Sequence, residues 1–159
     1  MLPGVLRENR HAGAERAGGL TMPSLTSVLE GCLKNNKDAL GVAVVDLESG
    51  LLIAVAHNVP YFTETYLDAI AAAAVDMFRG KTVSAVEKLL TSLRGSLVRD
   101  MIKEAQITTE ATYHFMGTSP ANSTALVVLI TSRKADIVAG WATLRGLIAA
   151  VAPLCPRAY

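Results

Sequence analysis

The pattern of apolar and polar residues predicts helices and strands in a definite order. Apolar residues first recur at helical spacing from Leu25 to Leu33, before Asn36 and after Thr21 or Ser24, either of which can cap the helix. Two runs come next, LGVAVVD and LLIAVAHN, separated by a turn in which Gly50 suits a positive φ. Because both runs are nearly continuously apolar, we expect an antiparallel hairpin whose strands are covered on both faces.

A second helix is predicted from Thr63 to Arg79, in an alanine-rich segment. Its polar residues occupy one side of the helix and leave an apolar arc of about 200°. A helix that only covers a sheet needs about half of that arc. Part of this helix should therefore contact a second partner, unless the whole helix is buried within its own domain.

The remaining sequence predicts one more helix, three strands and a closing helix. Residues 83–98 repeat apolar side chains at helical spacing. Strand-like segments are found at about 101–109, 112–118 and 124–131; the first carries charges typical of an edge strand, and the third, ALVVLI, is typical of a central one. The last helix begins at Asp136 and stops at Pro153. Five strands joined mainly by hairpins predict an α+β fold with an antiparallel sheet between helices.

The chain of 159 residues is long enough for one domain with its own core. We expect a single domain over residues 22–153, an N-terminal tail of residues 1–21 whose composition is typical of a mobile segment, and a short C-terminal tail of residues 154–159. Hydrophobic residues make up 51% of the chain, and the mean hydropathy is +0.35. This surplus favours an additional buried surface such as a subunit interface.

Charge and cysteine content disfavour several classes of function. The net charge is +1, from 15 basic and 14 acidic residues scattered along the chain, so we expect no nucleic-acid binding. The run AIAAAAV is far shorter than the roughly 20 apolar residues that cross a bilayer, so we expect no membrane insertion. Cys32 and Cys155 have no Cys or His neighbours at metal-ligand spacing. This favours a cytoplasmic protein with reduced thiols, while a single disulfide stays open as the alternative.

The segment FRGKT ends like a nucleotide-binding P-loop, but the rest of that motif is missing. The phosphate cradle requires G-x-x-x-x-G-K-[ST] after a strand, whereas Val75 stands where the first glycine belongs. The alanine-rich residues before Gly80 favour a helix instead. We therefore interpret Gly80 as a left-handed cap that ends this helix.

Few residues suggest catalysis or metal binding. His57 and His114 lack the acidic or thiol neighbours expected of a metal site, so we expect each to face solvent or to be hydrogen-bonded. Asp46 is interpreted as a turn residue and Trp141 as a core residue. Five arginines are candidates for a cationic site residue, and nothing in the sequence singles one out: Arg79, Arg94, Arg99, Arg133 and Arg145.

Four segments in order give the chain a resemblance to a known family. They are LEGCLKNN, GVAVVDLESGLLIAVA, YLDAIAAAAVDMF and ALVVLITSRKADIVAGWATLRGLIAAV. Together they resemble the Roadblock family of dynein light-chain-like proteins, which includes bacterial regulators of Ras-like GTPases. The resemblance covers about Met22 to Pro153 and implies a profilin-like sandwich. It departs from the family in the stretch 81–97, which is longer than the usual link, and in the N-terminal tail.

The resemblance implies a non-catalytic homodimer without cofactor or metal, formed through the second helix and the strand after it. The implied partners are a second copy of the chain and a small Ras-like GTPase, with regulation of that GTPase as a further option. Carried onto this chain, the dimer interface would include Leu67, Ile70, Ala71, Ala74 and Phe78 of the helix, together with backbone pairing near Lys103, Ala105 and Ile107.

Two other classes of function stay open. A small-molecule sensor or scaffold with a profilin-like fold is the alternative, which a polar pocket inside the core would favour and a solid aliphatic core would not. An enzyme that uses His57 or His114 ranks last.

Overall fold

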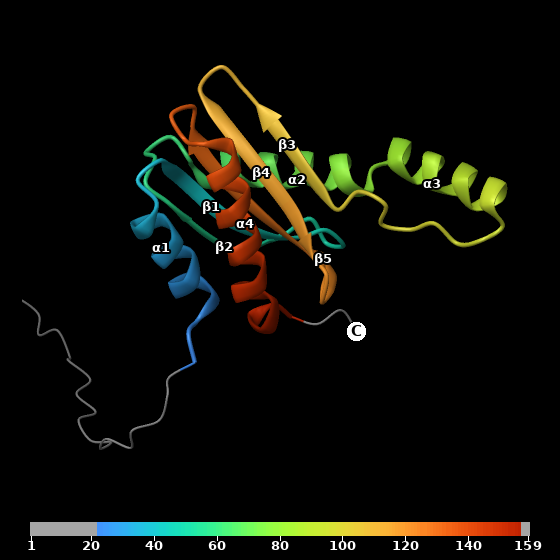
Figure 1. Ribbon diagram of the computed structural model, residues 1–159, viewed down its shortest axis with the longest axis horizontal. Coiled ribbons are helices and arrows are strands. Elements are labelled where there is room, and N and C mark those ends of the chain that lie inside the picture. Colours follow the sequence, from blue (N-terminus) through green and yellow to red (C-terminus); the bar gives the residue numbers. More distant parts are fainter. Residues whose placement is uncertain (1–21, 157–159) are drawn as a thin grey trace, which may run out of the picture.

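The computed structural model describes residues 22–156, and the predicted tail of residues 1–21 lies outside them. Helices and strands succeed one another in the predicted order, with ends within a few residues of those expected (Figure 1). Their bounds are α1 Leu25–Asn35, β1 Ala39–Asp46, β2 Leu52–His57, α2 Glu64–Arg79, α3 Lys81–Arg94, β3 Glu104–Thr108, β4 Thr112–Ser119, β5 Asn122–Ser132, α4 Ile137–Val151 and the short 3-10 helix η1 Ala152–Leu154.

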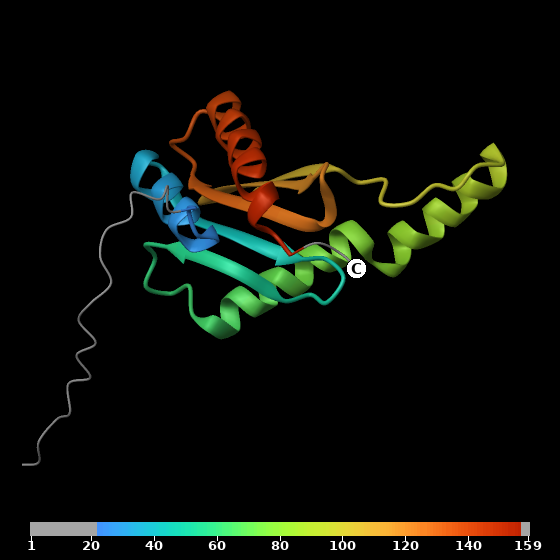
Figure 2. The same cartoon turned by 90° about the horizontal axis from the view of Figure 1, so that it is seen from below.

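The five strands form one antiparallel sheet in the order β2-β1-β5-β4-β3. Helices α1 and α4 lie on one face and α2 on the other, which Figure 2 shows from the side. The strand β5 is central and β3 lies at an edge, as predicted. The expectation of coverage on both faces is confirmed for β1 but is wrong for β2, because β2 forms the second edge and is half-buried over most of its length.

Side chains of alternating residues fill two cores, one on each face of the sheet. Along β5, Ala125, Val127 and Leu129 pack under α1 and α4, whereas Leu126, Val128 and Ile130 pack against α2. Both cores are aliphatic with a few aromatic rings. In the part of the chain that the structure describes, only two buried residues are polar, Ser119 and Thr131.

Polar side chains cap the helices where the sequence predicts. Ser24, and not Thr21, caps α1, because its hydroxyl accepts a hydrogen bond from the backbone N–H of Ser27 at 3.1 Å. Thr63 caps α2 and Asp136 caps α4 in the same way. These caps satisfy N–H groups that have no partner within the first turn of a helix.

The turn between β1 and β2 is built as predicted. Gly50 has a φ of +76°. Asp46 accepts hydrogen bonds from the backbone N–H groups of Glu48 at 3.2 Å and Ser49 at 3.1 Å, and from the Ser49 hydroxyl at 2.5 Å. Although partial burial alone would raise it, these hydrogen bonds lower the pKa of Asp46. Asp46 is therefore a turn residue.

The prediction of a left-handed cap at Gly80 is wrong. This residue is extended, with φ −63° and ψ 170°, because it ends α2 and begins α3 with no turn between them. A glycine is required for another reason, since a Cβ here would collide with the carbonyl oxygen of Asp76. The left-handed cap lies one helix later, at Gly95, and ends α3 at Arg94. Because a helix precedes Lys81, the segment FRGKT does not have the strand-to-loop geometry of a P-loop.

The third helix projects from the body of the molecule beyond β3 (Figures 1 and 2). We call α3 and the segment that returns along it, residues 81–101, the α3 arm. Backbone N–H groups of the returning segment donate to the helix: Val98 to Thr91 Oγ1 at 2.9 Å, and Met101 to Glu87 Oε1 at 2.8 Å. No residue of α3 is buried.

The chain remains packed beyond the expected stop at Pro153. Cys155 is buried in the core under α1 and α4, and Cys32 packs against the same core. Both cysteines are free thiols. Residues Ile137–Leu154 are together long and apolar enough to cross a membrane, which the length of unbroken apolar runs in the sequence does not reveal. One side of this helix is nevertheless buried against the sheet, at Leu144, Ile148 and Val151.

Candidate interaction surface

The outer edge of β3 presents unpaired backbone groups. Within residues 22–156 this strand pairs only with β4. The N–H of Thr109 donates to Thr112 O, and that of Thr118 to Lys103 O, each at 2.9 Å. Because antiparallel strands alternate their hydrogen bonds, the odd-numbered residues of β3 face β4, and Glu104, Gln106 and Thr108 direct their backbone groups outward. Such an edge can accept another strand.

Helix α4 holds this edge strand in place through two polar contacts. The Arg145 guanidinium contacts both carboxylate oxygens of Glu104, at 3.1 and 2.9 Å. The indole Nε1–H of Trp141 donates to Gln106 Oε1 at 3.0 Å. The hydrogen bond from Arg145 lowers the pKa of the Glu104 carboxyl, so the pair stays charged at neutral pH. Trp141 also packs edge-on against the Phe115 ring. Its half-buried side chain therefore contributes to the core and also anchors β3.

One side of α2 is occupied by the chain's own sheet. Ala71, Ala74 and Phe78 are buried in the core beneath α2, and Leu67 packs against that core. The prediction that these side chains line a dimer interface therefore needs correction, because a 200° apolar arc does not show which part of it faces the sheet. Ala105 and Ile107 also direct their side chains against this core, which leaves the predicted backbone pairing of their strand a prediction. Lys103 is exposed at the start of the edge.

A second apolar flank of α2 is only partly covered by the core. Tyr66, Ile70, Ala73 and Met77 recur at intervals of four, three and four residues, so they lie along one side of the helix. Tyr66 and Ala73 are exposed, whereas Met77 packs against the core beneath α2. Val75 lies on the opposite side, where it packs near Gly50 in the β1–β2 turn. The flank therefore faces away from that turn, and β3 is the sheet edge opposite β2. Ile70 is the only predicted interface residue of the helix that belongs to this flank. The spacing i, i+4, i+7 is the sequence signal that identifies the other residues of the flank.

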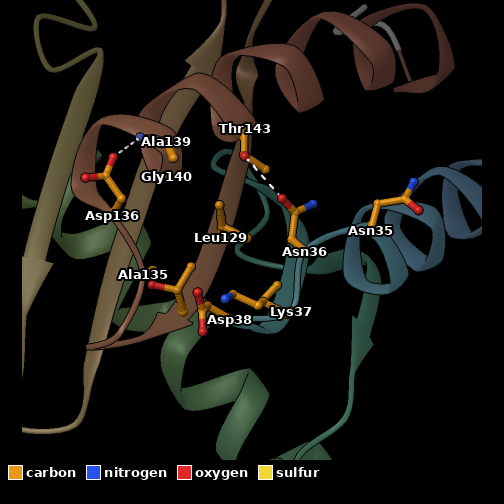
Figure 3. A pocket seen from close by; sticks show the side chains of 12 residues that line it. Asn35, Asn36, Lys37, Asp38, Leu129, Ala135, Asp136, Ala139, Gly140 and Thr143 are labelled. Carbon is orange, nitrogen blue, oxygen red and sulfur yellow. Dashed lines mark hydrogen bonds between the residues drawn. The ribbon is translucent and has the colours of Figure 1, made fainter.

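An open groove of about 230 Å³ lies between the end of α1 and the start of α4 (Figure 3). Some of its polar side chains are used within the chain. The Asn36 amide donates to Cys32 O at 2.7 Å and accepts from the Thr143 hydroxyl at 3.4 Å, which links the end of α1 to α4. Asp136 caps α4 through the N–H of Ala139 at 2.8 Å.

The sensor alternative has little support in the core. The space between the sheet and α2 is about 20 Å³ and is lined by apolar residues around Ala71 and Val128. Such a space is large enough for about one water molecule. Within the described residues, no group of three or more His, Cys, Asp or Glu side chains could hold a metal ion.

Both histidines are hydrogen-bonded, as predicted. His57 Nδ1 lies 3.3 Å from the backbone N–H of Val59, and His114 Nε2 lies 2.9 Å from the Thr112 hydroxyl. Burial lowers the pKa of His114. Burial likewise raises the pKa of both cysteine thiols, which makes them poor nucleophiles at neutral pH.

Three of the five candidate arginines support the fold. Arg79 Nε lies 3.1 Å from Asp100 Oδ1, and its Nη2 donates to Ser123 O at 2.8 Å. Arg133 donates to Thr109 O at 2.8 Å. Arg145 binds Glu104 as described above. The other two, Arg94 and Arg99, are exposed on the α3 arm.

Comparisons with known proteins identify the fold. No protein-family model and no curated protein sequence matches the chain. The Roadblock/LC7 domain from Streptomyces avermitilis superposes with a TM-score of 0.59 and 18% identity, covering 82% of this chain and 97% of that domain. Gliding protein MglB from Thermus thermophilus gives 0.61 and 18%, covering 82% and 87%. An MglB with tetrameric arrangement gives 0.61 and 19%, covering 82% and 86%. The chain has the Roadblock/LC7 fold.

Proposed function

We propose that this protein is a non-catalytic, cytoplasmic homodimer that binds a small Ras-like GTPase. The observation that carries the proposal is the pairing of two features on one side of the molecule: the outward backbone groups of β3 and the apolar flank of α2. The Roadblock/LC7 fold and the sequence resemblance to GTPase regulators support it. A similar structure, MglB, is known in a tetrameric arrangement, which is consistent with self-association.

The proposed dimer has a single two-fold symmetry axis. A two-fold axis beside β3 pairs this strand with the β3 of a second copy, antiparallel, and joins two five-stranded sheets into one. The same axis brings the flank around Ala73 against its own copy, where a small side chain lets two helices approach closely. Burial of both features removes an unpaired edge that would otherwise invite aggregation.

The GTPase is recognised by surface contact, without a bound cofactor. A binding face spanning both copies distinguishes the two nucleotide states of a GTPase through its switch segments, which change conformation on hydrolysis. Arg79, Arg133 and Arg145 are engaged within the fold, and nothing singles out the exposed Arg94 or Arg99 for an active site, so we place regulation in the positioning of the GTPase's own residues. The mechanism thus requires shape complementarity and no catalytic group of this chain.

Sedimentation equilibrium of two matched variants tests the homodimer. Ala73→Glu places a charge on the apolar flank, and Ala72→Glu places the same charge at an exposed position about 100° around α2 and outside the flank. We expect Ala73→Glu to raise the dimer Kd by at least about tenfold, on the order of 1.4 kcal/mol, because an unpaired carboxylate is costly to bury. Ala72→Glu should leave the Kd unchanged. A wild-type protein that is strictly monomeric at micromolar concentration would overturn the proposal.

Binding of the GTPase is tested separately by calorimetry. Purified Ras-like GTPases from the same genome are loaded with GDP or with a non-hydrolysable GTP analogue and titrated with the dimer. We expect one of them to bind in one nucleotide state at least about tenfold more tightly than in the other. Equal affinities for both states, or binding of none, would remove the GTPase from the proposal and leave the homodimer intact.

A further inference from the structure

The α3 arm carries an apolar stripe that the rest of the described chain does not cover. At 100° per residue, Val83, Val86, Leu89, Leu90 and Leu93 lie within an arc of about 120°. Leu89 and Leu93 are 59% and 73% exposed. The returning segment bonds to Glu87 and Thr91, on a different side of the helix. No residue of α3 belongs to either core.

The arm offers the apolar area that a stable dimer needs. A specific interface buries about 800 Å² on each partner, and its energy is concentrated in large side chains. The β3 edge is only five residues long, and the α2 flank centres on Ala73. By contrast, five of the eleven exposed large hydrophobic residues in the described chain lie on the arm: Val86, Leu89, Leu93, Leu97 and Met101. Edge pairing alone is thus too small an interface.

Symmetry determines where the arm would lie in the dimer. The two-fold axis that pairs β3 with its copy makes the two α2 helices antiparallel. Helix α3 continues from the C-terminal end of α2 and projects beyond β3 (Figure 1). In the proposed dimer, the two-fold axis places the second copy on this side. Its 14 residues span about 21 Å. It therefore reaches the N-terminal end of the partner's α2.

That end of α2 has the chemistry to receive the arm. Tyr61 and Tyr66 are 64% and 37% exposed. The Tyr66 ring stacks on Phe62 and the Tyr61 ring meets it edge-on, with ring centroids 5.2 and 5.3 Å from that of Phe62. Exposed aromatic rings of this kind are common anchors in protein interfaces.

We propose that the α3 arm packs against a second copy of this chain, with the stripe around Leu89 and Leu93 seated on the partner's Tyr61 and Tyr66. This inference rests on the proposed homodimer and adds a second contact region, which occurs twice per dimer. The long segment between α2 and β3 thereby takes part in dimer formation.

The first experiment compares dimer Kd values by sedimentation equilibrium. Leu89→Ser/Leu93→Ser removes the stripe at two exposed positions, and Ala85→Ser/Ser92→Ala changes two exposed positions outside it. We expect the first pair to weaken the dimer at least about tenfold and the second to leave it unchanged. Far-UV circular dichroism verifies that α3 is still folded.

The second experiment locates the contact. A photo-crosslinking amino acid replaces Leu93, and ¹⁵N-labelled and unlabelled chains are mixed before irradiation. We expect mixed-isotope links between the peptide containing residue 93 and the peptide containing Tyr61 and Tyr66. Links within one chain only, or to another part of the partner, would overturn the inference.

The two proposals fail in distinguishable ways. A dimer that is weakened by Ala73→Glu but not by the leucine variants would overturn the inference and retain the homodimer. A wild-type chain that stays monomeric would overturn both.

Discussion

Arg79, Arg133 and Arg145 each connect segments that are far apart in the sequence. Arg79 ties the end of α2 to Asp100, which precedes β3, and to Ser123 at the start of β5. Arg133 bonds to Thr109 O and lies over the Tyr113 ring, 4.8 Å from its centroid. A planar guanidinium can bind two partners and stack on a ring at once, which a lysine ammonium cannot. Single residues thus fix the hairpin ends around the β3 edge.

His114 gives the stability of the fold a pH dependence. Its pKa is lowered in the folded state, so the unfolded chain takes up a proton at higher pH than the folded chain does. The free energy of unfolding should therefore fall as pH drops below about 6.5 and level off once the folded pKa is passed. Urea denaturation between about pH 7.5 and pH 5 measures this slope.

The matched variants are His114→Gln and, at an exposed position, His57→Gln. We expect the first to flatten the pH dependence and the second to keep the wild-type slope. Identical slopes in all three proteins would show that His114 does not contribute.

At the scale of elements, α4 shows how close packing decides whether replacing a glycine by alanine stabilises or destabilises the fold. A Cβ at Gly140 would come within 2.6 Å of Phe115 Cε2, whereas a Cβ at Gly146 has nothing within 4 Å. We expect Gly140→Ala to destabilise the protein by about 1–3 kcal/mol, because the gain in helix propensity is smaller than the cost of overpacking. Gly146→Ala should stabilise it by about 0.5–1 kcal/mol. Urea denaturation compares the two; shifts in the same direction would contradict the packing argument.

Local patterns predict most elements, because periodicity and caps act over a few residues. Ser24, Thr63 and Asp136 mark helix starts correctly, and the run ALVVLI identifies the central strand. Gly80 is misread since the conformation of a cap depends on the residues after it, and here a second helix begins at once. The apolar run of β2 likewise does not reveal its edge position, which is set by pairing between distant segments.

The candidate surface is less predictable than the fold. A helix with a wide apolar arc has two faces that could be buried, and only the tertiary structure shows that Ala74 and Phe78 take the inner one. The outward direction of Gln106 depends on the register between β3 and β4. Several of the side chains that sequence reasoning assigns to the interface are therefore part of the chain's own core, whereas the interface itself stays a prediction.

At the scale of the whole molecule, backbone amide exchange reports whether two sheets join. The outward N–H groups of β3 belong to Glu104, Gln106 and Thr108, and those of Ala105 and Ile107 face β4. Raising the protein concentration through the dimer Kd should slow exchange at Gln106 and Thr108 and leave Ala105 and Ile107 unchanged. Residue-resolved hydrogen exchange by NMR measures this; equal behaviour of odd and even residues would exclude pairing through this edge.

Gly80 lies where the α3 arm leaves the body and joins α2 to α3 without a turn. The bond between Arg79 and Asp100 holds the returning segment at the arm's base. A change at this one position would thus redirect the arm while the two cores stay as they are. Related chains that fold identically could in this way recognise differently shaped companions, so the selectivity of assembly is separable from the stability of the fold.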